Sequence, residues 1–170
     1  MNSRSRSYRK LGAAAAAVGV LAAIAVPSLA DHGLPHPELL GRGTFIDKVS
    51  VAVRNKQFRR RPEWVFVKDS SDIVVLRITI EAGGVAPWHN HTGVGFLTNL
   101  GPGVLTNYLG DDCEPRLFYP GDAFIDPGHD ELHAVRNDSN QEIVILATFV
   151  GIEDAPVLPE PAPEACAHVL

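Results

Sequence analysis

Two histidines separated by one residue, His89 and His91, are the residues of this 170-residue chain whose spacing most directly suggests chemistry. Side chains at positions i and i+2 of a β-strand point to the same face. The preceding stretch, Ile73 to Ala82, is rich in β-branched residues, which favours a strand. Two imidazoles on one face form half of a metal site, and His133 is the best candidate for the other half. The alternative is a pair of loop histidines without a ligand, because H-x-H alone is a weak motif.

Residues around these histidines match two separated motifs of a known family. Gly83, followed after five residues by His89-x-His91, matches the first half of the first cupin motif, G-x5-H-x-H. The spacing of four later residues resembles the second cupin motif, G-x5-P-x-G-x2-H-x3-N: Gly121, Pro127, His133 and Asn137. The match runs from Ile73 to Val150, and the chain resembles a small single-domain cupin of type 2. The resemblance implies an all-β jelly roll with a mononuclear metal site inside the barrel, its three histidines coming from two strands.

The chain departs from the family pattern at two places. The family's glutamate, expected three or four residues beyond the second histidine, is here Gly95 or Phe96. There is also one extra residue between Pro127 and His133. In most of the family that glutamate is the fourth ligand, so the ligand set of this chain is an open question. Three acidic residues of the second motif could supply the carboxylate instead: Asp126, Asp130 or Glu131.

The resemblance implies one divalent transition metal held by His89, His91 and His133, and imidazole suits Fe, Mn, Zn, Cu or Ni. Three neutral histidines leave positions open for water, dioxygen or substrate, as in zinc hydrolytic sites and in three-histidine cupin thiol dioxygenases. The uncompensated charge would favour an anionic ligand. Three function classes follow: a small-molecule oxygenase, a secreted ligand-binding module without turnover, and a metal-free cupin.

Several residues near the histidines could line a pocket or support the ligands: Trp88, Gly95, Phe96, Phe124 and His129. Strand alternation does not decide which aromatic rings face inward, and ordinary core packing explains them equally well. His129 could guard the mouth of the site. Small cupins often pair, so a homodimer is a further expectation from the resemblance.

The first thirty residues have the three parts of a secretory signal peptide. An unbroken apolar run, Leu11 to Val26, precedes small residues that end at Ala30. Four basic residues come before this run: Arg4, Arg6, Arg9 and Lys10. The run is short for a bilayer core of roughly 30 Å, so a stable membrane anchor is not expected. We therefore expect cleavage near Ala30 and a secreted or extracytoplasmic chain.

Removal of the signal peptide changes the charge balance. Of 15 basic residues four precede residue 31, whereas all 20 acidic residues lie at or after it, so the remaining chain carries 11 − 20 = −9 charges with neutral histidines. Such a charge argues against nucleic acids and anionic membranes as partners. The exception is the basic cluster Arg54 to Arg61, which is either an anion contact or a solvated turn between strands.

From Thr44 onward, short apolar runs alternate with turn-forming residues such as Asp69 to Asp72 and Gly110 to Asp112. No segment of ten or more residues after the signal peptide has a helical stripe. The pattern predicts an antiparallel sandwich or barrel, independently of the family resemblance. We expect the barrel over residues 44–152, after an extended lead-in over 31–43. A proline-rich tail over 153–170 follows, in which strands are not expected.

The chain has two cysteines, Cys113 in a turn and Cys166 in the tail. In an exported protein two cysteines are expected to pair as a disulfide. The competing hypothesis, in which Cys113 is a reactive thiol or a metal ligand, has no supporting motif.

Overall fold

The computed structural model describes residues 33–57, 63–129, 131–152 and 158–170. The expected signal peptide, Asp130 and residues 58–61 of the basic cluster lie outside these ranges. Residues 31–170 form one unit, to which all the described residues belong. No helix within the described ranges is long and apolar enough to cross a bilayer.

Almost all regular structure in the described ranges is β-strand. The elements are β1 (His36–Asn55), β2 (Glu63–Ile80), β3 (Val85–Asn90), β4 (Val94–Pro102), β5 (Leu105–Leu109), β6 (Pro115–Phe118), β7 (Ala123–Asp126), β8 (His133–Arg136), β9 (Ile143–Val150), β10 (Leu158–Pro159) and the 3₁₀ helix η1 (Glu164–Cys166). The expectation of an all-β chain is therefore confirmed.

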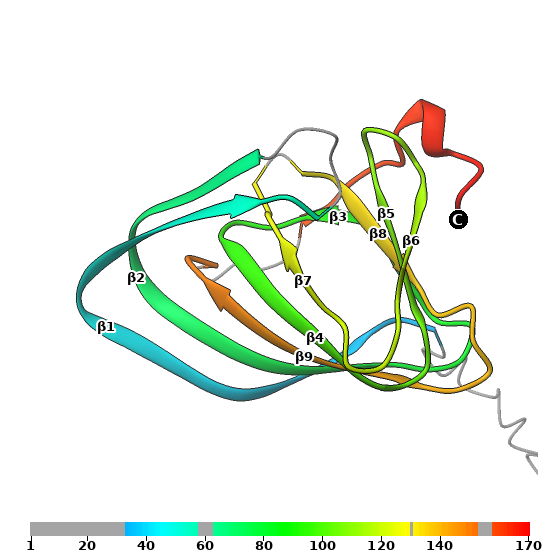
Figure 1. Cartoon of the computed structure of the whole chain (residues 1–170), viewed down its shortest axis with the longest axis horizontal. Helices are drawn as coiled ribbons and strands as arrows, with labels where there is room; N and C mark the ends of the chain where they lie inside the picture. The colour runs from blue at the N-terminus through cyan, green and yellow to red at the C-terminus, as the bar shows by residue number, and fades with distance from the viewer. Residues whose placement is uncertain (1–32, 58–62, 130, 153–157) are drawn as a thin grey trace, which may run out of the picture. The chain divides into compact units, whose positions relative to one another are not determined.

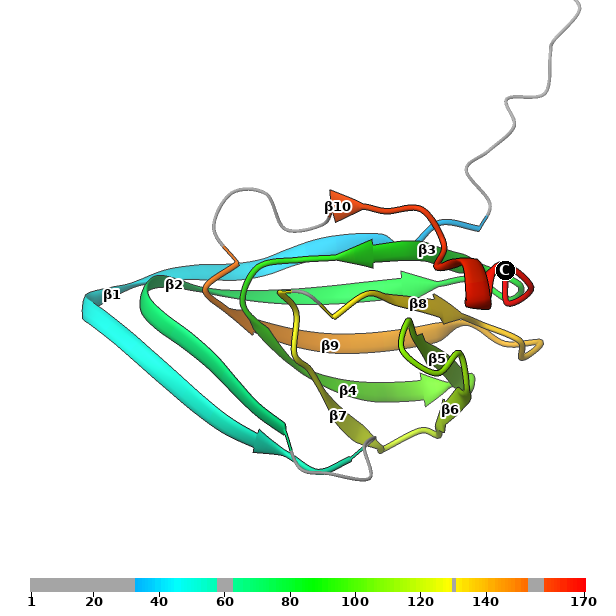
Figure 2. The ribbon, with the colours of Figure 1, turned by 90° about the horizontal axis from the view of Figure 1, so that it is seen from above.

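The strands form two antiparallel sheets, in the orders β1-β2-β9-β4-β7 and β10-β3-β8-β5-β6. Figures 1 and 2 show the two sheets on opposite sides of a common interior, with β4, β9 and β7 facing β8, β5 and β6. Most neighbours are far apart in sequence, since β9 lies between β2 and β4 and β8 lies between β3 and β5. This is the jelly roll that the strand pattern and the two motifs imply.

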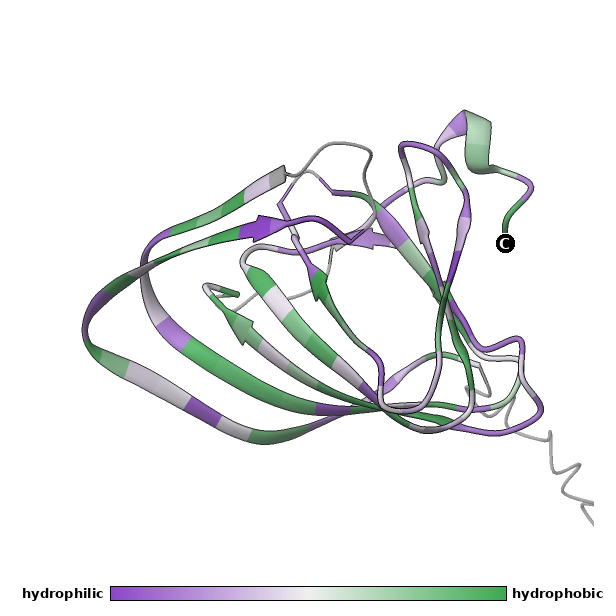
Figure 3. Ribbon diagram, in the orientation of Figure 1, coloured by the Kyte–Doolittle hydropathy of each residue, from purple (hydrophilic) through white to green (hydrophobic). Residues whose placement is uncertain are grey.

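Alternate residues of the strands fill the interior. On β9, Ile143, Ile145 and Ala147 are buried in the main core, whereas Leu146 is partly exposed on the outside. Figure 3 shows the same alternation as changes between hydrophobic and hydrophilic colour along the strands. Phe118 and Phe124 stack in this core with their ring centroids 4.2 Å apart. The period of two fixes which residues of each strand can take part in a site inside the barrel.

β1 and β2 are much longer than the other strands, with 20 and 18 residues, and they bend away as a two-stranded arm (Figures 1 and 2). Apolar side chains of the arm, including Val65 and Val67, pack against Val94 and Val150 of the barrel. Gln57, just after β1, adds polar contacts to β7. Its Nε2 donates to the Ala123 carbonyl at 3.0 Å, and its Oε1 accepts from the Ile125 N–H at 2.9 Å.

Three segments differ from the sequence expectations. The separator Asp69 to Asp72, expected as a turn between strands, lies inside β2, where the β1–β2 register shifts. β1 begins at His36, so most of the expected lead-in over 31–43 is already a paired strand. The tail contains β10, although its prolines argue against strands. Proline cannot donate to a ladder but is tolerated at a sheet edge. β10 is such an edge, because Leu158 and Pro159 pair with β3 alone.

The end of the tail lies on the outer face of the second sheet. Cys166 forms a disulfide with Cys113, the two Cα atoms being 5.3 Å apart. Cys166 also packs with Trp88, Ala134 and Val169 in an apolar cluster, here called the outer cluster. The Glu160 N–H donates to the Trp88 carbonyl at 3.0 Å. The tail therefore covers the strands that carry the motif histidines, from the side opposite to the barrel interior.

Candidate metal centre

His91, Asp126 and His133 meet at the end of the barrel where β3 and β7 end and β8 begins. Oδ2 of Asp126 lies 3.0 Å from Nε2 of His91 and 3.1 Å from Nε2 of His133. All three residues are buried, with exposed fractions of 3%, 7% and 2%. Three ionisable groups buried at this spacing are costly unless they pair with one another or hold an ion.

Asp126 lies beside the place where the family's glutamate is missing. Asp126 of β7 pairs directly with Gly95 of β4, one of the two positions at which the family's glutamate is expected. Residues directly opposite in an antiparallel ladder share a face. Asp126 thus brings to this face, from the neighbouring strand, the carboxylate that β4 lacks. Sequence reasoning named Asp126 among three alternatives, but no sequence signal gives the β4–β7 register.

Gly95 is confined by the aromatic ring of Phe149. A Cβ atom at position 95 would lie 2.6 Å from Phe149 Cε1 and 2.8 Å from Leu97 Cδ1. The Phe149 ring in turn packs edge-on against the His91 ring, at 5.1 Å between centroids. A side chain at position 95 would therefore press on the residue that packs against His91.

A backbone carbonyl orients the ring of each of the three motif histidines. Nδ1 of each lies within hydrogen-bond distance of a nearby backbone carbonyl: Pro87 for His89 (2.6 Å), Thr92 for His91 (3.2 Å) and Glu131 for His133 (3.0 Å). Because a carbonyl only accepts, Nδ1 carries the hydrogen and Nε2 keeps its lone pair. This tautomer binds metals through Nε2, and the partner of Nδ1 fixes the plane of the ring.

His89 lies beside the group but is not one of its members. Its ring centroid is 4.2 Å from that of His133 and 6.3 Å from that of His91. The β3–β8 register shifts between Ala86 and His89, and His91 lies just beyond the end of β3. Burial, followed by the charge of His133, lowers the pKa of His89 to about 4. Its imidazole is therefore neutral near pH 7, as a metal ligand must be.

His133 and Asp126 favour each other's charged forms. Burial acts to raise the pKa of the Asp126 carboxyl, but the facing imidazoles of His133 and His91 outweigh it and hold this pKa well below its usual range. Burial likewise acts to lower the pKa of His133, and the Asp126 carboxylate outweighs it, so the pKa of His133 is raised.

The Nε2 atom of His91 distinguishes an ion site from a set of ion pairs. It is buried 3.0 Å from the Asp126 oxygen, yet it makes no hydrogen bond of acceptable geometry. A buried polar atom without a partner is costly. Neighbouring ligand atoms on metal bonds of about 2.1 Å at right angles would lie about 3.0 Å apart. The observed distances and the donor set, two imidazoles and one carboxylate, therefore fit one divalent transition metal.

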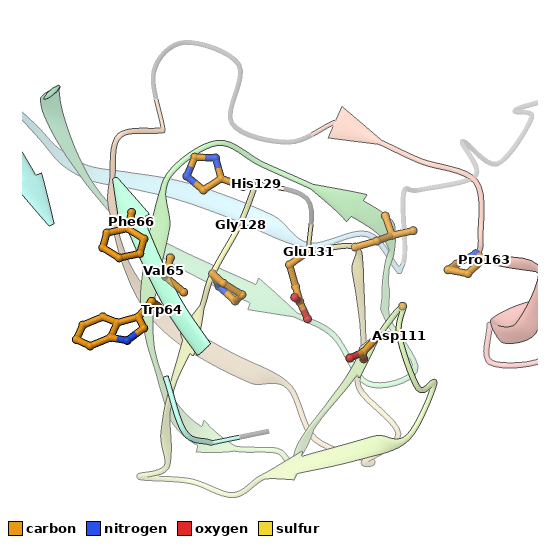
Figure 4. Close-up of a pocket in the computed structure, with 11 residues that line it drawn as sticks. Trp64, Val65, Phe66, Asp111, Gly128, His129, Glu131 and Pro163 are labelled. Atoms are coloured by element: carbon orange, nitrogen blue, oxygen red, sulfur yellow. The ribbon is translucent and has the colours of Figure 1, made fainter. Parts of the chain in front are cut away.

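An open pocket of about 520 Å³ adjoins this group, and Figure 4 shows the residues that line it. Its wall includes Pro127 and Gly128, which follow Asp126 directly, and Leu132, which precedes His133. Gly128 also lies against a ligand ring, because a Cβ atom there would be 2.8 Å from His91 Nδ1. The pocket, here called the mouth pocket, is thus separated from the metal group by residues next to the ligands in sequence.

The acidic residues Asp111 and Glu131 extend toward each other on one side of the mouth pocket (Figure 4). His129 lines the same pocket, and its N–H donates to the His91 carbonyl at 2.6 Å. The expectation that His129 guards the mouth of the site stays a prediction. The mouth pocket is the concave surface from which a small molecule could approach the group.

The three expected aromatic residues do not line the mouth pocket. Phe96 is 39% exposed, Phe124 is buried in the main core, and Trp88 belongs to the outer cluster. Strand alternation explains the positions of Phe96 and Trp88. Phe96 follows Gly95 and Trp88 precedes His89, so both side chains point to the opposite face of their strands. Phe149, which does contact His91, was missed because its place depends on the β4–β9 register.

No protein-family model matches the sequence, and no curated protein matches it either. Three solved structures are similar to this chain. DMSP lyase DddQ from Ruegeria pomeroyi DSS-3 matches with a TM-score of 0.46 and 19% identity, over 69% of this chain and 53% of that chain. The polyketide cyclase RemF from Streptomyces resistomycificus matches with a TM-score of 0.45 and 22% identity, over 54% of this chain and 64% of that chain. An uncharacterised protein with a double-stranded β-helix domain from Klebsiella pneumoniae matches with a TM-score of 0.45 and 18% identity, over 52% of this chain and 71% of that chain. The chain spans about half the length of DddQ, at 53%. At these identities the likeness concerns the fold alone.

The chain's own topology agrees with the two motifs. Two facing five-stranded antiparallel sheets form the jelly roll. Within it, β3 from the first motif pairs with β8 from the second, and His89 lies directly opposite His133. Both motifs therefore occupy the places that the cupin resemblance implies, and the fold is the jelly roll expected from it.

Proposed function

We propose that this chain binds one divalent transition metal through His91, Asp126 and His133 and acts on a small molecule at that ion. The observation that carries the proposal is the single carboxylate oxygen within 3.1 Å of two buried Nε2 atoms, one of which has no hydrogen-bond partner. This group contains the two histidines and one carboxylate that non-haem iron(II) oxygenases use, and a further histidine ligand would still leave open positions on an octahedral ion. An enzyme that uses dioxygen is therefore the preferred function.

His89 is the proposed fourth protein ligand. Its Nδ1 is held by the Pro87 carbonyl, which leaves Nε2 as the ligand atom, and its pKa of about 4 keeps the ring neutral. With His89 included, the three histidines of the two motifs gain a carboxylate from Asp126. One ligand charge then offsets part of the charge on the ion, which weakens the earlier expectation of an anionic substrate.

The chain's residues have separable roles in this proposal. The ion, when bound, would supply Lewis-acid and redox chemistry. The carbonyls of Thr92 and Glu131 hold His91 and His133 in the ligating tautomer. Phe149 covers one side of the His91 ring and excludes water there. The mouth pocket admits the small molecule.

We also propose that the chain is exported after cleavage near Ala30. The Cys113–Cys166 disulfide supports export, because disulfides persist in oxidising compartments. Such a location does not maintain ferrous iron, so manganese, zinc and copper have to be tested beside iron. The same location favours the second candidate function, a secreted module that binds a ligand at the metal without turnover. The expected homodimer remains a prediction that size-exclusion chromatography with light scattering can check.

The first experiment is elemental analysis of protein purified without a chelator or a histidine tag. We expect about one transition metal per chain in the wild type and a strong loss in Asp126→Asn, which keeps the shape but removes the charge. Asp138→Asn is the matched control, because this exposed carboxylate contacts only Arg136 among the ion pairs of the described residues. Wild-type metal content in Asp126→Asn would show that the site is misassigned.

The second experiment separates the two functions. Oxygen consumption is measured for iron-, manganese- and copper-loaded protein with a panel of thiols, phenols and small acids, while thermal shifts report binding of the same compounds. Turnover with any metal supports the enzyme. Thermal shifts without turnover would reject it and leave the binding module.

A further inference from the structure

Four asparagines are buried in the described part of the chain, and one of them differs from the rest. Oδ1 of Asn55, Asn99 and Asn137 accepts a hydrogen bond from the backbone N–H two residues later, at 2.8 to 3.1 Å. These three amides hold turns together. Asn107 is equally buried, at 3% exposure, but its Oδ1 has no hydrogen-bond partner. It lies within β5 and supports no turn.

The Asn107 side chain points into the barrel. Asn107 pairs with Val135, a residue of the main core, whereas the next residue, Tyr108, packs with the outer cluster. Leu109, two positions along β5, pairs with His133. Asn107 is therefore the diagonal neighbour of His133 on the inner face, at roughly 7–8 Å in a regular ladder. It occupies the first inward-facing row beneath the metal group.

Nothing in the described surroundings satisfies this amide. The residue opposite Asn107 on β6 is Arg116, but its guanidinium is occupied by Asp112 and by the Glu114 carbonyl. An unpaired buried carbonyl costs stability, and an apolar residue of the same size would avoid that cost. The sheet has no need of an amide at position 107, since the backbone alone makes the ladder. A polar atom kept there at a cost indicates a partner that enters the site.

We propose that Asn107 positions the small molecule at the metal group, its Oδ1 accepting a hydrogen bond from a hydroxyl or amine hydrogen of that molecule. The inference rests on the proposed function, because the ion held by His133 brings the ligand next to Asn107. It narrows the ligand class to small molecules with an O–H or N–H donor beside the atom that binds the ion. Ethers and fully substituted amines of the same shape lack the donor and bind more weakly.

The test uses two probes that differ only in this donor. Glycolate and methoxyacetate both present a carboxylate and an α-oxygen to a metal, but only glycolate can donate from that oxygen. Zinc-loaded wild type, Asn107→Leu and Thr106→Val are titrated with each probe by calorimetry, after metal content has been measured. Thr106→Val is the matched control, since Thr106 is equally buried on the outer face of the same strand.

We expect the preference for glycolate over methoxyacetate to fall about tenfold in Asn107→Leu and to stay unchanged in Thr106→Val. Asn107→Leu should keep its zinc and melt at a higher temperature than the wild type without a probe, because a costly unpaired amide is gone. Asn107→Val, which suits a strand, serves as a second variant if the leucine does not fold.

Each result separates this inference from the proposed function. An unchanged glycolate preference in a zinc-bound Asn107 variant would overturn the role of Asn107 alone. The same holds if zinc-loaded wild type binds neither probe. Wild-type protein that binds no metal would overturn the proposed function, and the inference with it.

Discussion

Residues adjacent in sequence on β3 and β8 lie on opposite faces of the sheet and have different roles, in the metal group on one face and in packing on the other. On the inner face His89 lies opposite His133, next to Asp126 and His91. On the outer face Trp88 and Ala134 pack under the disulfide-linked tail. The inner face gathers ionisable side chains around the metal group, whereas the outer cluster is mostly apolar and is closed by the disulfide.

This difference indicates how a small barrel stays folded although its site contains polar groups without partners. Polar groups that wait for an ion or ligand add little to stability, so the strands that carry them need support from elsewhere. Here the support lies one residue away in sequence and on the other side of the sheet. Chemistry and stability should therefore respond to different substitutions on the same strand.

The largest expected effect is the loss of the ion on the inner face. His133→Ala should reduce metal content from about one ion per chain to almost none, because it removes one imidazole and the partner of Asp126. Circular dichroism should show an intact fold. Trp88→Phe, on the outer face, should keep the ion. Loss of metal in both variants would show that the two faces are not independent.

Removal of the disulfide should give the largest loss of stability without loss of the site. The bridge closes a loop with a sequence separation of 53, and its absence in Cys113→Ser/Cys166→Ser should cost about 4 kcal/mol in the chain-entropy account. Urea unfolding measures this cost, and metal titration at low temperature measures the site. Metal affinity weakened more than about tenfold would mean that the tail also orders the inner face.

The acid response of the metal-free protein should come partly from His89. Its pKa is about 4 in the folded chain and 6.5 as the ordinary value, so the unfolded chain binds more protons between these pH values. Wild-type stability should therefore fall by up to roughly 3 kcal/mol as pH drops from 6.5 to 4. His89→Gln should show a flatter profile there, measured by urea unfolding with chelator present. The raised pKa of His133 changes the stability only above pH 6.5, so it does not contribute to the loss between pH 6.5 and 4. Equal slopes for the two proteins would contradict the burial of a neutral His89.

The smallest expected effect concerns Gly95. Gly95→Ala places a Cβ atom against Phe149 and should destabilise the fold by about 2 kcal/mol, as an overpacked core does. Because Phe149 supports His91, metal affinity should fall several-fold as well. Gly43→Ala is a control with a milder contact, 3.2 Å to Ile73 Cγ2, at a site far along β1. A Gly95→Ala protein with unchanged stability and affinity would show that Phe149 moves aside freely.

The sequence predicts the barrel well because local rules determine it. Alternating apolar runs and turn residues indicate the strands, and the two motif spacings predict that His91 and His133 converge. The partners that complete the site depend on register. Asp126 faces Gly95, and Phe149 reaches His91, only through the pairing of β4 with β7 and β9. Those pairings join residues far apart in the chain, so local sequence contains no sign of them. The same reason explains β10, whose proline is tolerated because that strand is an edge.

The contact of Gln57 with β7 has a consequence for the behaviour of the protein in solution. β7 is the last strand of its sheet, and its free edge could pair with a strand of another molecule. The Gln57 side-chain amide occupies the Ala123 carbonyl and the Ile125 N–H of that edge, as a peptide group of a neighbouring strand would. Gln57 thus occupies backbone groups that a strand of another molecule would need, and it should protect the barrel from edge-to-edge aggregation.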